Sequence, residues 1–262
     1  MTWQYETIIC ELIDNVFIIK INRPKVLNAL NSQVFFELND VFEKIKEDNN
    51  VKVVIISGSG DKAFVAGSDV SEMSKYSLIQ GRQFALRVNL AQQNIANSPK
   101  PTIAAINGFA FGGGLEVAMC CDIRIASQNA KFGQPEINLG IIPGGGGTQR
   151  LSRLIGLGRA KQMVFGGLPI DAQRAYEIGL VNQVVSSEQL QDEAMRMAQV
   201  IANKSSVTLA FAKQALNLGL DLDLENALKV EIELFAECFG TEDGKEGLIA
   251  FLEKRKANFT GT

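Results

Sequence analysis

The sequence of 262 residues contains no histidine. Without an imidazole, the chain cannot use a Ser-His-Asp triad, a Cys-His protease pair or a histidine-ligated zinc ion. The proton carriers that remain near neutral pH are carboxylates, perturbed Lys or Cys side chains, and water. If the protein is an acid-base enzyme, we therefore expect it to use Glu or Asp.

Cysteine is scarce, and its spacing suits neither a metal site nor a disulfide framework. The four cysteines are Cys10, Cys120, Cys121 and Cys238, and no two of them form a CxxC pair. This pattern argues against a zinc site and against a disulfide-dense secreted fold. Residues 1–12 contain two acidic residues and lack the basic start and apolar core of a secretory signal. We expect a cytoplasmic protein with free thiols.

The chain also has no surplus of positive charge. It has 26 Lys and Arg against 29 Asp and Glu, and its net charge of -3 has the wrong sign for a protein that works on nucleic acid. The least charged stretch, residues 101–121, contains Glu116 and four glycines and lacks the density of Leu and Ile typical of a membrane span. We expect neither a nucleic-acid nor a membrane partner, and an anionic ligand would need a local basic site.

Nucleotide-binding motifs are missing, although glycine is locally abundant. Ten of the 24 glycines lie between residues 108 and 147. Residues 112–114 lack GxGxxG spacing, and residues 143–148 lack the Lys of a P-loop. Such clusters indicate a backbone that approaches a ligand closely with exposed N–H groups. For residues 144–147, tight turns between packed elements are an equal alternative.

Hydrophobic patterns predict an α/β fold in which strands and helices alternate. Such alternation is typical of crossover units in a parallel sheet, and the first two strands read as a hairpin. Ser32 is the expected N-cap of the first helix. The expected strands are residues 8–12, 16–21, 51–57, 102–107, 123–126 and 181–185. The expected helices are a segment that Ser32 caps and that runs through Ile45, a short helix that starts near Leu115, and residues 70–97, 160–165 and 172–178.

Beyond residue 187 the pattern predicts helices only. A strand-free end must bury its apolar stripes elsewhere, and a neighbouring subunit is one solution. No Pro/Gly/Ser linker and no repeat marks a boundary before this end. We expect a core of residues 1–190 with the active site, followed by a helical oligomerisation region of residues 191–262.

Two glutamates are candidates for acid-base chemistry. Residues 112–114 lie between an expected strand and an expected helix, where free N–H groups point at any negative charge. Glu116 lies in the first helical turn, where the helix dipole favours a carboxylate, and Glu136 follows Pro135 among apolar residues. In one shared site, repulsion and burial would leave one of them protonated and the other ionised. Simple helix-end stabilisation by Glu116 and a solvated loop position for Glu136 are the alternatives.

Six segments spread over the whole chain form an ordered series of motifs. They are residues 22–30 (NRPKVLNAL), 63–69 (AFVAGSD), 112–116 (GGGLE), 132–136 (FGQPE), 143–151 (PGGGGTQRL) and 251–259 (FLEKRKANF). In this order they resemble the enoyl-CoA hydratase (crotonase) family, and within it they are most similar to the bacterial short-chain members. The resemblance implies a crotonase-like spiral of ββα units with a C-terminal α-helical trimerisation region, and a homo-hexamer built as a dimer of trimers.

The resemblance also implies an activity. A hydro-lyase of this kind reversibly hydrates short-chain trans-2-enoyl-CoA to 3-hydroxyacyl-CoA, as between crotonyl-CoA and 3-hydroxybutyryl-CoA. Glu116 would act as base toward Cβ and Glu136 as acid toward Cα, while the N–H groups of Ala66 and Gly113 would donate to the thioester oxygen. CoA is part of the substrate, and no other cofactor and no metal is implied.

Alternatives within and outside this activity stay open. Family members that mainly move a double bond typically lack one of the two glutamates, so both glutamates together favour a hydratase over an isomerase. A hydratase for longer or branched chains is a further alternative. Some members bind RNA through a lysine-rich helix, and an RNA-binding or non-catalytic module is the alternative from another class. Residues 34–50 here hold five acidic residues against Lys44 and Lys46, which argues against it.

The resemblance implies a CoA site built mainly from two segments of the chain. Lys62 is a further candidate cation, and Asp69 has an alternative role as a helix N-cap. Met73, Tyr76 and Leu86 are candidates for narrowing the acyl pocket, although apolar residues at helical spacing are more often plain core. The expected CoA contacts are Lys25, Val26, Leu27, Ala29, Ala66, Gly67, Ser68, Asp69 and Val70, with Lys254 and Phe259 supplied by a neighbouring subunit.

Overall fold

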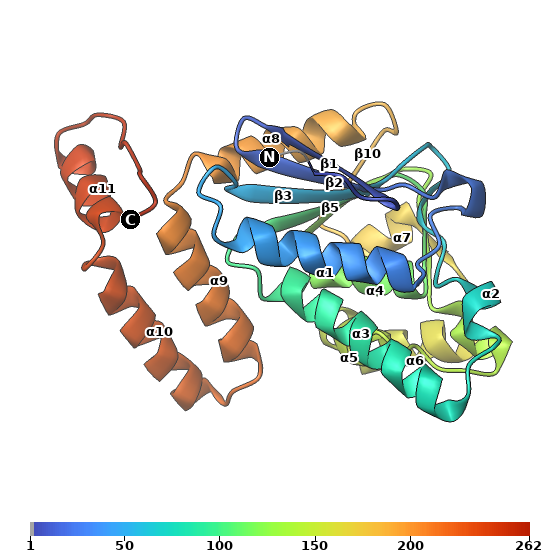
Figure 1. Ribbon diagram of the computed structural model, residues 1–262. Helices are drawn as coiled ribbons and strands as arrows, with labels where there is room; N and C mark the ends of the chain where they lie inside the picture. Colours follow the sequence, from blue (N-terminus) through green and yellow to red (C-terminus); the bar gives the residue numbers. More distant parts are fainter. Residues whose placement is uncertain (1–2) are drawn as a thin grey trace.

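Ten strands form two sheets in the computed structural model, which describes residues 3–262 (Figure 1). The larger sheet has, in spatial order, β1 (Ile8–Ile13), β2 (Val16–Ile21), β3 (Val53–Gly58), β5 (Thr102–Ile106), β7 (Ile123–Ser127) and β10 (Gln183–Val185). The smaller sheet has β4 (Ala63–Val65), β6 (Phe109–Phe111), β8 (Lys131–Gly133) and β9 (Ile170–Asp171). The predicted hairpin of β1 and β2 is confirmed, and the other strand pairs of the larger sheet are parallel.

Helices cover both faces of the larger sheet. In β3, Val54 and Ile56 face a core that includes α1 (Ser32–Lys46), while Val53 and Ile55 face α8 (Leu190–Ala202). Figure 1 shows α1 and α8 on opposite sides of this sheet. Each such side chain contributes about 1.5–3 kcal/mol to the stability of the fold when it is fully buried. A strand that is buried on both faces is therefore rich in β-branched residues without interruption, and such a run predicts this strand. Helix α8 packs on this sheet through Leu190, Ala194, Ala198 and Ala202.

From β3 to β8 the chain repeats a strand-strand-helix order, in which the first strand of each pair lies in the larger sheet and the second in the smaller. The helical elements between the strands hold the segments that carried the sequence motifs. After β4 come α2 (Val70–Met73) and α3 (Leu78–Ala96), after β6 comes α4 (Gly113–Cys120), and after β8 come η2 (Pro135–Leu139), α5 (Gly147–Ile155) and α6 (Leu157–Gly166). A 3-10 helix, η1 (Pro24–Val26), precedes α1, and α7 (Ala172–Glu177) lies between β9 and β10.

Several expectations about single elements are wrong in detail. The continuous helix over residues 70–97 breaks between α2 and α3, where Ser77 starts α3 with a capping box to Gln80. Asn31, not Ser32, is the N-cap of α1, because its side chain accepts from the Val34 N–H at 3.0 Å. The strands of the smaller sheet and helix α5 were not expected. These elements are short or start in glycine-rich sequence, so they show little periodicity.

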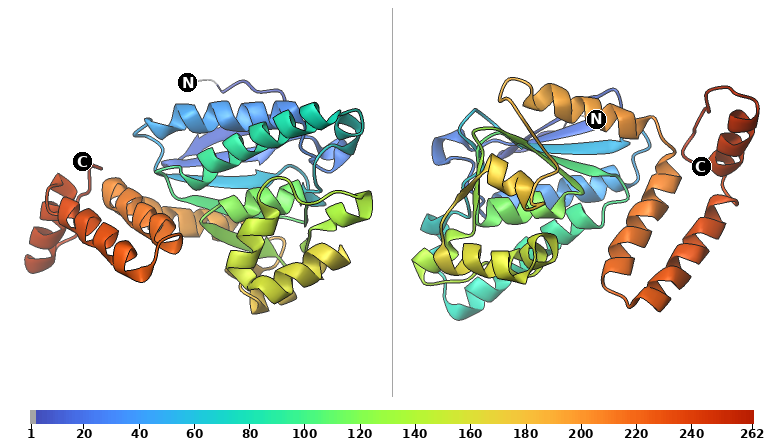
Figure 2. Two further views of the ribbon diagram at one scale, coloured as in Figure 1. Left: turned by 90° about the horizontal axis from the view of Figure 1, so that it is seen from below. Right: turned by 180° about the vertical axis from the view of Figure 1, so that it is seen from behind.

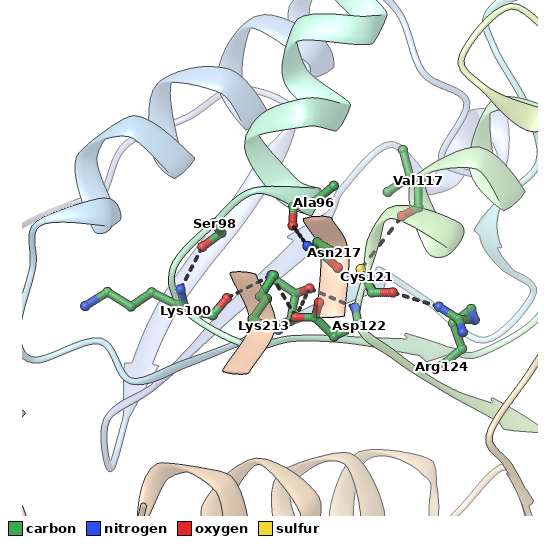
Figure 3. A network of polar contacts seen from close by, with 10 residues as sticks. Ala96, Ser98, Lys100, Val117, Cys121, Asp122, Arg124, Lys213 and Asn217 are labelled. Carbon is green, nitrogen blue, oxygen red and sulfur yellow. Dashed lines mark hydrogen bonds and ion pairs between the residues drawn. The ribbon is translucent and has the colours of Figure 1, made fainter. Parts of the chain in front are cut away.

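The C-terminal region consists of α9 (Ser206–Leu220), α10 (Leu224–Cys238) and α11 (Glu242–Leu252), which confirms the strand-free prediction. A buried lysine ties α9 to the core: Lys213 Nζ lies 2.8 Å from the Asp122 carboxylate, and Asp122 accepts from the Thr102 N–H at 2.7 Å (Figure 3). Beyond α9, Figures 1 and 2 show α10 and α11 standing off from the body.

Helices α10 and α11 leave many large apolar side chains exposed. Leu224, Phe235 and Phe251 are 75%, 65% and 83% exposed. No helix within residues 3–262 combines the length and the apolar character that a membrane crossing requires. The exposed apolar side chains of α10 and α11 have no partner within the described residues of the single chain.

Candidate active site

A cavity of about 390 Å³ opens where α2, α3, the start of α4 and η2 meet. Seven of the predicted catalytic, oxyanion-binding and CoA-binding residues line it: Ala66, Gly67, Ser68, Val70, Gly113, Glu116 and Glu136. The fold thus brings together segments from three successive strand-strand-helix units. The candidate acid-base pair shares one cavity.

Glu116 is fixed by the backbone of the second glycine cluster. Its side chain is almost completely buried, and its Oε1 atom accepts from the N–H groups of Gly145 and Gly147, each at 2.8 Å. A Cβ atom at Gly145 would lie 2.4 Å from Glu116 Oε2, so only glycine permits this approach. The glycines at these two positions therefore present N–H donors to a carboxylate of the protein itself.

The two carboxyl groups have different electrostatic surroundings. Burial raises the pKa of Glu116, while the two N–H donors and the positive charge of Arg150 oppose the rise. Burial, together with the charge of Glu116, raises the pKa of Glu136 to about 7. Two N–H bonds to one oxygen favour the ionised form. Glu116 is thus the member favoured as a carboxylate, and Glu136 is the member poised to hold a proton near neutral pH.

Glu136 is held by a buried amide that had no predicted role. Gln134 is fully buried, and with its amide nitrogen turned toward Glu136 it donates to both carboxyl oxygens, at 2.9 and 3.0 Å. On the other side, a Cβ atom at Gly112 would lie 2.8 Å from Glu136 Oε1. Gly112 has φ +50°, a conformation that favours glycine. This pair of neighbours fixes the place of the carboxyl group.

One of the two N–H donors expected in the cavity, that of Ala66, is engaged elsewhere. The Ala66 N–H donates to the Leu27 carbonyl at 3.0 Å, so the expectation that it serves a ligand is corrected. In the same loop, the N–H groups of Gly67 and Ser68 have no acceptor among the residues that the structure describes. Gly113 is the first residue of α4, where an N–H lacks an intrahelical partner. A Cβ atom at Gly113 would lie 3.7 Å from Ser68 N, so the two donors are neighbours.

Most expected CoA contacts on the first segment lie outside the cavity. Lys25 and Val26 belong to η1, and Leu27 and Ala29 follow it. Asp69 is engaged elsewhere: its carboxylate accepts from the Ser71 N–H at 3.2 Å as the N-cap of α2, and it lies 3.0 Å from the Arg23 guanidinium. The N-cap alternative for Asp69 is therefore confirmed.

The two C-terminal candidates also lie away from the cavity. Figure 1 shows α11 at the opposite end of the molecule from α2, and Lys254 follows α11 directly. Phe259 packs near Gly247 of α11, and Asp243 accepts from the Thr260 and Gly261 N–H groups at 2.7 and 2.9 Å. Within one chain, these residues do not line the cavity.

Helices α2 and α3 supply an apolar wall. Met73 and Tyr76 line the cavity as anticipated, whereas Leu86 is not among its lining residues and is half exposed. Phe84 and Val88 line it instead, although the sequence had not singled them out. Their four-residue spacing places both on one helix face, but the same spacing is typical of plain core residues.

Chemically, this arrangement suits proton transfer at two neighbouring atoms of an apolar ligand. One carboxylate and one carboxylic acid provide a base and an acid in the same cavity. Two free N–H groups can stabilise an oxyanion that develops beside them.

Comparisons with known proteins show that the chain is similar to enoyl-CoA hydratases. The chain is 49% identical to the short-chain-enoyl-CoA hydratase of Clostridium acetobutylicum, over 97% of each chain. It is 48% identical to the crotonyl-CoA hydratase of Syntrophomonas wolfei, over 97% of this chain and 98% of that one. The crystal structure of enoyl-CoA hydratase from Bacillus anthracis superposes with a TM-score of 0.95, at 39% identity, over 98% of this chain and 100% of that one.

The match extends over nearly the whole chain, and the α/β fold with C-terminal helices is that of the solved relative. The family profile described as enoyl-CoA hydratase/isomerase matches residues 11–262. The chain therefore belongs to the enoyl-CoA hydratase/isomerase family.

Proposed function

We propose that this chain reversibly hydrates short-chain trans-2-enoyl-CoA to 3-hydroxyacyl-CoA. The observation that carries the proposal is that Glu116 and Glu136 line one cavity with different electrostatic surroundings. The names of the two curated relatives support the substrate class. Two carboxyl groups, not one, favour addition of water over simple movement of a double bond.

In the hydration direction, one water molecule lies between the two carboxyl groups. The Glu116 carboxylate takes a proton from this water while the water oxygen bonds to Cβ of the substrate. Glu136 gives its proton to Cα, which restores a neutral thioester. In dehydration the two residues exchange roles, because the same path is followed in reverse.

The thioester oxygen gains negative charge as water adds, and the Ser68 and Gly113 N–H groups donate to it. One such donor contributes about 2.7–4 kcal/mol to transition-state stabilisation in a site of this kind. Carboxyl groups and N–H donors serve every step of this path. We therefore keep the expectation that CoA, as part of the substrate, is the only organic group required and that no metal takes part.

The proposal extends to the assembly. The exposed apolar faces of α10 and α11 support a homo-hexamer, built as a dimer of trimers, in which neighbouring chains cover these faces. Lys254 and Phe259 would then contact the CoA of a neighbouring subunit, while Lys25, Val26, Leu27 and Ala29 contact the CoA of their own. The free thiols support a cytoplasmic location.

The direct test follows the loss of the enoyl-thioester absorbance with crotonyl-CoA, hexenoyl-CoA and decenoyl-CoA. We expect rapid loss with crotonyl-CoA and slower loss as the chain lengthens, since the cavity holds only about 390 Å³. Product analysis should identify 3-hydroxyacyl-CoA. Migration of the double bond without addition of water would instead establish an isomerase.

The pH profile provides a second prediction. Hydration needs a proton on Glu136, whose pKa is about 7, so kcat/KM should fall as pH rises above about 7. Dehydration needs the same pair with the same single proton, so its kcat/KM should show the same profile. Rates measured in both directions from about pH 6 to about pH 9 test this sign. A hydration rate that still rises above pH 8 would contradict it.

A further inference from the structure

Gln92 of α3 is a fully buried polar residue that the proposed mechanism does not use. Its Oε1 atom accepts from the Arg150 guanidinium at 3.3 Å, and Arg150 also donates to the Gly145 carbonyl at 3.1 Å. These bonds fix the orientation of the Gln92 amide. Its Nε2 atom has no hydrogen-bond partner in the described part of the chain.

The unpartnered nitrogen and the proposed base lie beside the same glycine, Gly145. A Cβ atom at Gly145 would lie 2.6 Å from Gln92 Nε2 and 2.4 Å from Glu116 Oε2. Glu116 uses Oε1 for both of its backbone N–H bonds, and residues 3–262 provide no hydrogen bond to Oε2. A buried donor without an acceptor and a carboxylate oxygen without a donor therefore lie beside the same glycine, with no hydrogen bond between them in this structure.

We propose that Gln92 is a positioning residue whose amide, oriented by Arg150, closes onto Glu116 Oε2 in the working enzyme, donates to it and holds the ionised carboxylate toward the substrate. The inference rests on the proposed role of Glu116 as the base. It adds a side-chain donor to the two backbone donors already on Oε1.

Packing alone does not explain this residue. A buried N–H without an acceptor is unfavourable, so an apolar side chain of the same volume would serve plain packing better. If a carboxylate accepts the hydrogen bond, the buried N–H is satisfied, and the bond stabilises the charged form of the carboxylate. Gly145 takes part as well, because any side chain there would occupy the place where the two polar groups approach each other.

The charge on Glu116 depends on groups from every element packed around it. Arg150 of α5 favours the carboxylate, and Glu136 of η2 opposes it. The Cys120 thiol, one turn further along α4, donates to the Glu116 backbone carbonyl at 3.1 Å. The neutral amide of Gln92 comes from α3. Its removal should therefore shift the titration of Glu116 without changing any formal charge in the site.

Gln92→Met tests the inference, because methionine fills nearly the same volume without a donor. An infrared titration of the protonated-carboxyl band, assigned to Glu116 by its loss in Glu116→Gln, needs no turnover. Loss of the donor should raise the midpoint of the Glu116 titration by about one pH unit. This shift corresponds to a change of about tenfold in the ionisation equilibrium of Glu116. The acid limb of kcat/KM should move upward with it, and kcat should fall about tenfold while KM changes little.

Gln93→Met is the matched control, because Gln93 is the exposed neighbour on the same helix, and it should match the parent in both measurements. Gln92→Leu is the second variant. It removes the amide N–H without adding a charge, and it should also raise the Glu116 titration. An unchanged Glu116 titration in both Gln92 variants would overturn the inference. If the parent chain fails to hydrate any enoyl-CoA but Gln92→Met shifts the titration, only the proposed function fails.

Discussion

Glu136→Gln is expected to lower the turnover of crotonyl-CoA by about 10²–10⁴-fold, the usual contribution of one general acid. Glutamine keeps the shape of the side chain and can still hydrogen-bond the buried Gln134 amide, but it has no proton to give to Cα. Fold and CoA affinity should be retained. Initial rates of absorbance loss, circular dichroism and calorimetric titration with CoA measure these three properties.

The control for this variant is Glu177→Gln, at an exposed glutamate of α7 that takes no part in the cavity. It should leave turnover unchanged. Glu116→Gln should cost about as much as Glu136→Gln, and the double variant only slightly more, since groups that act as a unit are not additive. Near-normal turnover of Glu136→Gln would remove Glu136 from the chemistry.

Gly114→Ala is expected to destabilise the fold by about 3 kcal/mol or more, at the upper end of the usual cost of overpacking. A Cβ atom at Gly114 would lie 2.2 Å from the Val65 carbonyl oxygen and 2.6 Å from the Val65 Cβ. Because the obstacle is the backbone of β4, α4 must move away from the strand. This movement displaces Gly113 and Glu116 together, so activity should fall as well. Urea unfolding followed by circular dichroism gives the change in stability.

Gly158→Ala is the matched control within a helix. A Cβ atom at Gly158 of α6 would meet no atom within 4 Å. Alanine is favoured over glycine in a helix by about 1 kcal/mol, so this variant should be as stable as the parent or slightly more stable. If Gly114→Ala were equally stable, the close contact of α4 with β4 would not be a requirement of the fold.

The sequence predicted those elements whose burial pattern is long enough to show a period. Strand β3 and helix α1 belong to this group, because a fully buried run and an amphipathic face are both visible over six or more residues. The three-residue strands β4, β6 and β8 are too short for any period. They exist because the larger sheet places their neighbours beside one another, which is a tertiary cause.

The residues of the site also divide into those that local sequence predicts and those that depend on the tertiary structure. Glu116, Glu136 and Gly113 could be predicted because the helix start after the glycine cluster and the two carboxyl groups are features of local sequence. The sequence could not show whether the N–H group of Ala66 or that of Ser68 is free to bind a ligand. This depends on the carbonyl of Leu27, a residue distant in sequence with φ +53°, which engages Ala66. Nor does local sequence show that Gln92 and Glu116 lie beside the same glycine, Gly145.

Helix α3 carries Phe84, Val88 and Gln92 at intervals of four residues, so one face of one rigid helix presents all three. The first two line the cavity, and the third lies beside Gly145, as the proposed base does. A larger pocket, selected by changing Phe84 or Val88, would shift the helix that also carries Gln92. In laboratory evolution, preference for a longer acyl chain and speed at the reacting carbons should therefore change together, and compensating substitutions should be found at Gln92 or Gly145.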